Sequence, residues 1–157
     1  MSETADVLGV VPPFKWRGKE YELGPCTFKV HALYETWLTK QALDGILRHE
    51  ADYPANVFEM MLTGHRMDLA SRRFSFAGQC CWESLRHPPG QQYVAWLLLK
   101  MKDKDVDQAM IAEVWQHNQK RQELADLVMR QVFGQYESDP PAAGGAAEQT
   151  FPQTLPG

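Results

Sequence analysis

The sequence predicts a mainly α-helical fold: a small helical domain with an N-terminal β-hairpin and a disordered C-terminal tail. Apolar residues recur at spacings of three and four through most of residues 27–133, as in helices that bury one face. Apolar and charged residues alternate on both sides of Gly18, as in a hairpin. After Tyr136, Pro, Ala, Gly and Gln dominate, and too few apolar groups remain to offset the entropy of ordering. The predicted boundaries are 1–12 for a flexible N-terminus, 13–136 for the helical domain and 137–157 for the tail.

Size and composition favour one globular domain with a protein partner. A chain of 157 residues fits a domain that buries about 68–70% of its unfolded surface. The formal net charge of -4 gives no reason to expect nucleic acid or an anionic membrane as the main partner. Residues 1–6 lack the positive start and apolar core of a signal peptide, and the odd number of cysteines, three, suits a reducing cytosol.

The hairpin is predicted from two short alternating runs, residues 14–16 and 21–23, joined by a turn at residues 17–20 that contains Gly18. An isolated two-stranded hairpin is marginal in water, so its apolar face should pack on the helices. That face would carry Phe14, Trp16, Tyr21 and Leu23.

The longest amphipathic helix is predicted from Thr27, a suitable N-cap, to about Glu50. A second helix should have Pro54 in its first turn, and Gly64 either ends it or loosens it. A third, short helix at about residues 77–86 would have to stop before the prolines that follow. The second helix carries Val57, Phe58, Met61 and Leu62, and the third would bury Cys81, Trp82 and Leu85.

Residues 91–102 contain the most apolar stretch of the chain. It is too short to span a bilayer, which needs about 20 apolar residues, and charged residues follow it at once. It is therefore either a central core helix or a partner-binding one. Its apolar residues cover nearly the whole circumference of a helix, more than a core on one side can hide, so some of them should be exposed.

The last helical region begins where Asp105 and Gln108 resemble a capping box. Helical spacing continues to Gly134, a plausible C-cap. Whether this region is one helix, or two with a break near residues 117–118, is left open by the sequence. The apolar residues concerned are Met110, Ile111, Val114, Trp115, Leu124, Leu127, Val128, Val132 and Phe133.

One cluster of residues carries metal-capable side chains: His65, Cys80, Cys81 and His87. Adjacent cysteines do not match the Cys-x-x-Cys spacing of zinc sites, and no second pair is present, so we expect no metal. No nucleophile turn surrounds either cysteine, which argues against covalent catalysis.

Other polar residues give no sign of enzymatic chemistry. The carboxylates of the predicted hairpin and helices show no pair at a spacing suited to acid–base work, and no Gly-rich phosphate loop is present, so no cofactor is expected. Arg66, Arg72 and Arg73 form a small basic patch that is best explained as a solvated helix face.

The chain also contains five tryptophans and seven methionines. Core packing accounts for most of them, but Trp and Met are also typical of grooves that bind amphipathic helices. The methionines that could line such a groove are Met60, Met61, Met67, Met101, Met110 and Met129.

Three features follow one another along the chain: the Gly18-Lys-Glu-Tyr21-Glu-Leu23 hairpin, the long helix that follows it, and the Tyr93-Val-Ala-Trp96-Leu-Leu-Leu99 helix with its short charged break. Together they resemble tail assembly chaperones of long-tailed bacteriophages. The resemblance covers roughly residues 14–134.

The resemblance implies a non-enzymatic role in the host cell cytoplasm. Members of the family bind the aggregation-prone tape measure protein, keep it in solution and help recruit tail tube subunits. The alternative is a structural virion or head-tail connector protein, and self-association is left open. The residues we expect to bind a partner are Tyr93, Trp96, Leu99, Met110 and Trp115.

Overall fold

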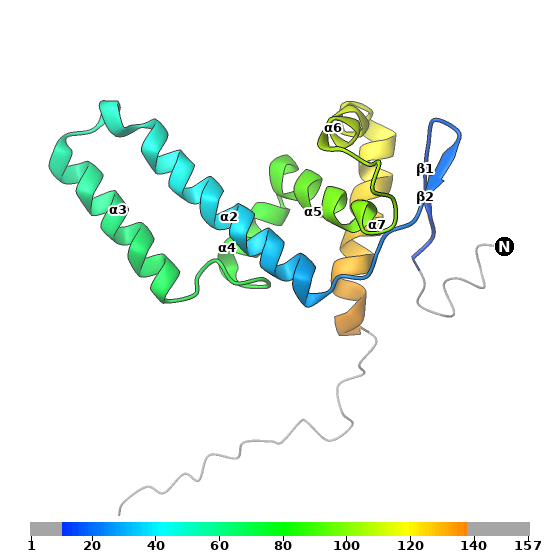
Figure 1. Ribbon diagram of the computed structural model, residues 1–157, viewed down its shortest axis with the longest axis horizontal. Coiled ribbons are helices and arrows are strands. Elements are labelled where there is room, and N and C mark those ends of the chain that lie inside the picture. Colours follow the sequence, from blue (N-terminus) through cyan, green and yellow to red (C-terminus); the bar gives the residue numbers. More distant parts are fainter. Residues whose placement is uncertain (1–10, 138–157) are drawn as a thin grey trace, which may run out of the picture.

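The computed structural model describes residues 11–137, which fold mainly into α-helices (Figure 1). The elements are β1 (Phe14–Trp16), β2 (Lys19–Tyr21), α2 (Phe28–Arg48), a 3-10 turn (Glu50–Asp52), α3 (Ala55–Ala70), α4 (Gln79–Leu85), α5 (Pro88–Lys100), α6 (Gln108–Gln116) and α7 (Asn118–Glu137). The predicted class, mainly α with an N-terminal hairpin, is confirmed. The tail expected at 138–157 lies outside the described residues, as do residues 1–10.

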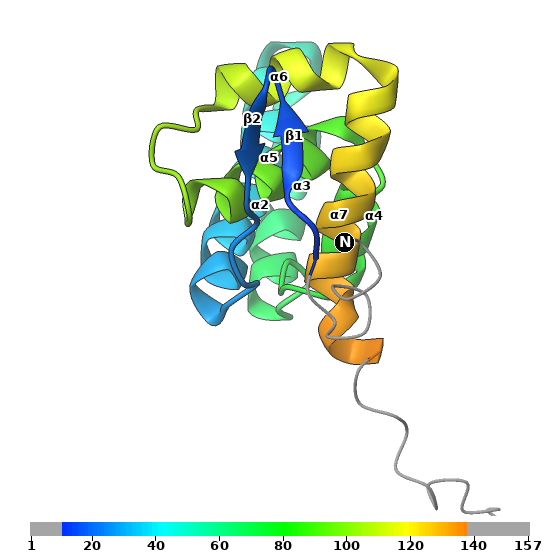
Figure 2. The ribbon, with the colours of Figure 1, turned by 90° about the vertical axis from the view of Figure 1, so that its right-hand side faces the viewer.

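Helix α5 occupies the centre of the bundle, where it contacts α2, α4, α6 and α7. Helices α2 and α3 form a helical hairpin, here called the α2–α3 arm, that projects to one side of this centre (Figure 1). The β-hairpin lies on the opposite side, where β1 runs beside α7 (Figure 2). Val11, which the sequence placed in the flexible N-terminus, is partly buried and packs against the core.

The central position of α5 explains its composition. Val94, Ala95, Leu98 and Leu99 are fully buried, and Leu97 is nearly so. Neighbouring helices lie on several sides of α5, so a nearly all-round apolar surface is hidden within one small domain. The core-helix alternative for residues 91–102 is therefore correct for most of this segment.

The β-hairpin is tighter than the sequence predicted. Arg17 and Gly18 both have positive φ, 49° and 77°, and they form a two-residue turn of the kind whose twist matches the strands. The second strand therefore begins at Lys19, and Tyr21 pairs with Phe14, so the predicted strand at 21–23 is wrong. Phe14 is fully buried, as expected for a hairpin that packs on helices.

Several helix ends differ from the prediction. Asp107, not Asp105, caps α6, because its Oδ1 accepts a hydrogen bond from the Met110 N–H at 2.8 Å. Gly64 lies within α3 and does not end it. Gly134 likewise does not end α7, which continues to Glu137.

The question of one or two C-terminal helices is settled by His117. Its backbone is extended, with φ -104° and ψ 103°, and it separates α6 from α7. This turn lets α6 and α7 contact each other while both also contact α5.

Trp82 is another difference, because the sequence placed it in the core. Its side chain is 40% exposed and stacks on Phe133 of α7, with ring centroids 4.2 Å apart. Helix α4 is short and presents only one narrow face, Cys81 and Leu85, to the core. Trp82 therefore covers the edge of α7 without entering the interior.

Candidate functional site: a groove between α2 and α5

Two stripes of side chains face each other where α2 runs beside α5. Lys29, Leu33 and Trp37 recur every fourth residue on α2, which places them on one face of that helix. Tyr93 and Trp96 form the matching stripe on α5, which Lys100 completes. We call the concave surface between the stripes the α2–α5 groove.

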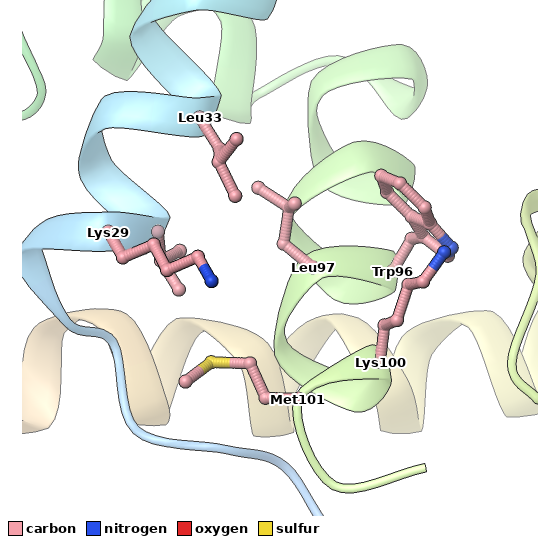
Figure 3. Close-up of a pocket in the computed structure, with 7 residues that line it drawn as sticks. Lys29, Leu33, Trp96, Leu97, Lys100 and Met101 are labelled. Carbon is pink, nitrogen blue, oxygen red and sulfur yellow. The ribbon is translucent and has the colours of Figure 1, made fainter. Parts of the chain in front are cut away.

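The first part of the groove is a hollow of about 410 Å³ with a mostly apolar wall (Figure 3). Leu33 and Leu97 point toward one another across it (Figure 3). Leu33 and Met101 remain 42% and 44% exposed, so the apolar wall is open to a partner. The lining residues are Lys29, Val30, Leu33, Trp96, Leu97, Lys100 and Met101.

A second hollow, of about 430 Å³, lies beside the same two helices and α6. An aromatic row lies between the two hollows: Trp37 of α2 stacks on Tyr93 of α5 with ring centroids 4.6 Å apart, and Tyr93 lies 5.5 Å from Trp96. The lining residues of this second hollow are Trp37, Pro89, Gln92, Tyr93, Gln108, Ala109, Ile111 and Ala112.

Hydrogen bonds and ring contacts hold the groove in shape. The Trp96 Nε1–H donates to the carbonyl oxygen of Val106 at 3.2 Å, and the Lys100 ammonium lies 4.6 Å from the centroid of the Trp96 ring. Burial raises the pKa of the Tyr93 hydroxyl above its ordinary value, which reflects how closely its neighbours pack around it. The groove therefore has a fixed aromatic wall before any partner binds.

Of the five predicted partner-binding residues, three keep accessible surface. Tyr93 and Trp96 line the groove, and Met110 is partly exposed on α6. Leu99 is fully buried and Trp115 is 7% exposed, so both belong to the core. Their assignment to an exposed surface was wrong, because the side of α5 that carries Leu99 is covered by neighbouring helices.

The opposite wall of the groove was not predicted as a site. Leu33 and Trp37 lie in the amphipathic helix predicted from Thr27 to about Glu50, and no residue of that helix was singled out for partner binding. Nothing in the sequence of α2 shows that its first half lies beside α5, about 60 residues later. The spacing of four between these residues is the one local signal that could have grouped them.

The residues considered for metal binding do not form a site. His65 is buried beside Phe74, with ring centroids 5.5 Å apart. Cys81 is fully buried and Cys80 is partly exposed. Within residues 11–137, no group of three or more His, Cys, Asp or Glu side chains is arranged to hold a metal ion.

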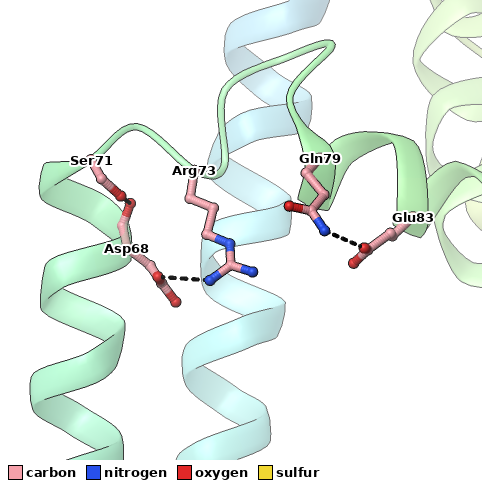
Figure 4. A network of polar contacts seen from close by, with 5 residues as sticks. All are labelled: Asp68, Ser71, Arg73, Gln79 and Glu83. Carbon is pink, nitrogen blue, oxygen red and sulfur yellow. Dashed lines mark hydrogen bonds and ion pairs between the residues drawn. The ribbon is translucent and has the colours of Figure 1, made fainter.

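The predicted basic patch is partly neutralised. The Arg73 Nη1–H donates to Asp68 Oδ1 at 3.3 Å, and the Ser71 hydroxyl donates to the Asp68 carbonyl oxygen at 3.1 Å (Figure 4). The Gln79 Nε2–H donates to Glu83 Oε1 at 3.0 Å on the neighbouring helix (Figure 4). The first two contacts hold the segment after α3 against Asp68 near the end of that helix, and the third lies within α4, so all three are local structural contacts.

The reactivity of the three cysteines tests whether Cys26 and Cys81 are buried in the core as the structure places them. Burial raises the pKa of the Cys26 thiol to about 11 and also raises the pKa of Cys81. Because the thiolate is the reactive form, iodoacetamide should modify Cys80 first in the folded protein at neutral pH, and Cys80→Ser should remove the rapid phase. Rapid labelling of Cys81, located by peptide mass spectrometry, would contradict the packing of α4.

Comparison with known proteins gives no assignment: no family model, no curated protein and no solved structure matches the chain. Among the described residues, no helix combines the length and the apolar character that crossing a membrane requires. A proposal about function therefore rests on the groove and on the sequence features described above.

Proposed function

We propose that this protein is a tail assembly chaperone of a long-tailed bacteriophage. It binds helical segments of the tape measure protein in the host cytoplasm, keeps that protein in solution and helps recruit tail tube subunits. The observation that carries the proposal is the α2–α5 groove, whose first hollow is mostly apolar and exposed at Leu33 and Met101. Two residues that line the groove, Tyr93 and Trp96, also belong to the motif on which the phage resemblance rests.

The dimensions of the groove suit a helix. The α2 stripe from Lys29 to Trp37 covers nine residues and rises about 12 Å along the helix, which equals roughly two helical turns. An amphipathic helix that lies in such a channel inserts side chains from positions i, i+3, i+4 and i+7. A tape measure chain exposes apolar helical surface until the tail tube encloses it, and a short groove covers such surface reversibly.

Co-expression with the tape measure protein of the same phage tests this proposal. The wild-type protein should raise the soluble fraction of the tape measure protein, and Leu33→Gln should reduce that effect, because a bound helix would bury an unpaired amide. Leu47→Gln is the matched control, since Leu47 lies on the same helix outside the groove and is similarly exposed, at 45%. Both variants should melt close to wild type.

Two outcomes would contradict the proposal in different ways. If the wild-type protein leaves the tape measure protein insoluble, the chaperone function is wrong. If Leu33→Gln and wild type solubilise it equally well, the binding surface lies elsewhere on the molecule.

The alternative, a structural virion or head-tail connector protein, is favoured by one observation. The α2–α3 arm exposes large apolar side chains, with Met60 at 72% and Met67 at 67%, and such residues suit packing between neighbouring subunits of a particle. Mass spectrometry of purified virions separates the two functions, because an assembly chaperone leaves the finished particle and a connector remains in it.

A further inference from the structure

We infer that the α2–α5 groove selects an acidic amphipathic helix, whose aliphatic side chains enter the groove while carboxylates on both flanks pair with Lys29 and Lys100. The inference rests on the proposed function to the extent that a tape measure segment would be the natural occupant. The chemistry of the occupant is argued from the groove alone.

The charge of the groove opposes the charge of the protein. The chain has a formal net charge of -4, yet the two charged residues that line the first hollow are both lysines. They lie on opposite walls, Lys29 on α2 and Lys100 on α5 (Figure 3). A helix bound between them therefore meets a positive charge on each side, which favours carboxylates flanking its apolar face.

The position of Lys29 supports this role. It is the second residue of α2, and the first turn of that helix contains no acidic residue. A cation at a helix N-terminus opposes the helix dipole, so Lys29 is unfavourable for the stability of α2. A residue that conflicts with its local structure in this way is typical of a functional surface.

The shape of the groove favours a helix over a flat anionic surface. The apolar wall formed by Leu33, Leu97 and Trp96 lies between the two lysines, within a hollow of about 410 Å³. Side chains that project from a helix can reach into such a hollow, whereas a lipid bilayer presents no comparable ridge.

Two synthetic peptides of about 18 residues test the inference, both designed as helices with leucines at i, i+3, i+4 and i+7. One carries glutamates on both flanks of the leucine face, and its twin carries lysines there. Isothermal titration should give a Kd about tenfold lower for the glutamate peptide at low salt, and the difference should shrink as salt is added.

Charge reversal in the protein provides the second readout. In Lys29→Glu/Lys100→Glu, the glutamate peptide should bind about tenfold more weakly than to wild type, and the lysine twin should bind more tightly. Arg66→Glu makes the same type of charge change on α3, outside the groove, and should leave both affinities unchanged. Lys29→Glu alone should melt at or above the wild-type temperature, because an acidic residue suits the first turn of a helix.

Equal affinity for the two peptides would overturn the inference, as would an unchanged preference in the double variant. Absence of peptide binding, together with lysine-dependent sedimentation on vesicles of phosphatidylglycerol, would overturn it in favour of a lipid surface. These results are separate from the co-expression test. If the protein solubilises the tape measure protein but binds both peptides equally, the proposed function stands and only the charge selectivity is wrong. If it prefers the glutamate peptide but leaves the tape measure protein insoluble, the charge selectivity stands and the proposed function is wrong.

Discussion

Replacing Leu99 with alanine should lower the free energy of unfolding by about 2–5 kcal/mol. Leu99 is fully buried in the central helix α5, so the truncation removes apolar contacts and leaves a cavity that the surrounding helices cannot easily close. Urea or thermal denaturation followed by circular dichroism measures the change.

Leu47→Ala is the control for this effect. Leu47 is 45% exposed near the end of α2, and a surface truncation should change stability by less than about 0.5 kcal/mol. If Leu99→Ala proves as stable as Leu47→Ala, the central position of α5 is wrong. The comparison also matters for the binding experiments. If Leu99→Ala unfolds the protein, loss of partner binding in that variant gives no information about the groove.

Replacing Gly90 with alanine should destabilise the protein by about 1–3 kcal/mol, although alanine normally favours a helix over glycine. Gly90 is buried in the first turn of α5, where a Cβ atom would overlap the carbonyl oxygen of Ser84 and lie 2.7 Å from the Tyr34 hydroxyl oxygen. The Tyr34 hydroxyl is hydrogen-bonded to Ser84 Oγ at 2.6 Å, so it cannot move freely away from the new Cβ atom. The Ser84 carbonyl oxygen belongs to the backbone and cannot move without shifting the chain.

The matched substitution is Gly64→Ala in the middle of α3. A Cβ atom there would meet nothing within 4 Å, so the variant should gain about 0.5–1 kcal/mol from the lower backbone entropy of its unfolded state. Opposite signs for the two Gly→Ala changes are the expected result. A stabilising Gly90→Ala would mean that α4 and α5 do not approach each other as closely as described.

The fold class could be predicted because its signals are local. Spacings of three and four located the helices, and the alternation around Gly18 located the hairpin, without any knowledge of neighbouring elements. The helix ends were harder to place, since Asp105 and Asp107 are both suitable caps and only the path of the chain selects Asp107. Gly64 and Gly134 resemble residues that end a helix, but α3 and α7 each continue beyond them.

The site could be predicted only in part, for a different reason. Trp96 and Leu99 are three residues apart on the same helix, and the sequence gives no basis for choosing which of them a neighbour covers. Trp96 lines the groove and Leu99 is buried, because several helices surround α5 and only part of its surface remains open. The second wall, with Lys29 and Leu33, depends on the same long-range arrangement.

The α2–α3 arm has a consequence for how the molecule opens. Helix α3 makes most of its contacts with α2, and His65 is its one buried residue. Its apolar contribution to the core is therefore small, and detaching it exposes little surface that the α5 bundle protects. We therefore expect α3 to separate at a lower free-energy cost than the helices around α5, and its backbone amides to exchange hydrogen before theirs.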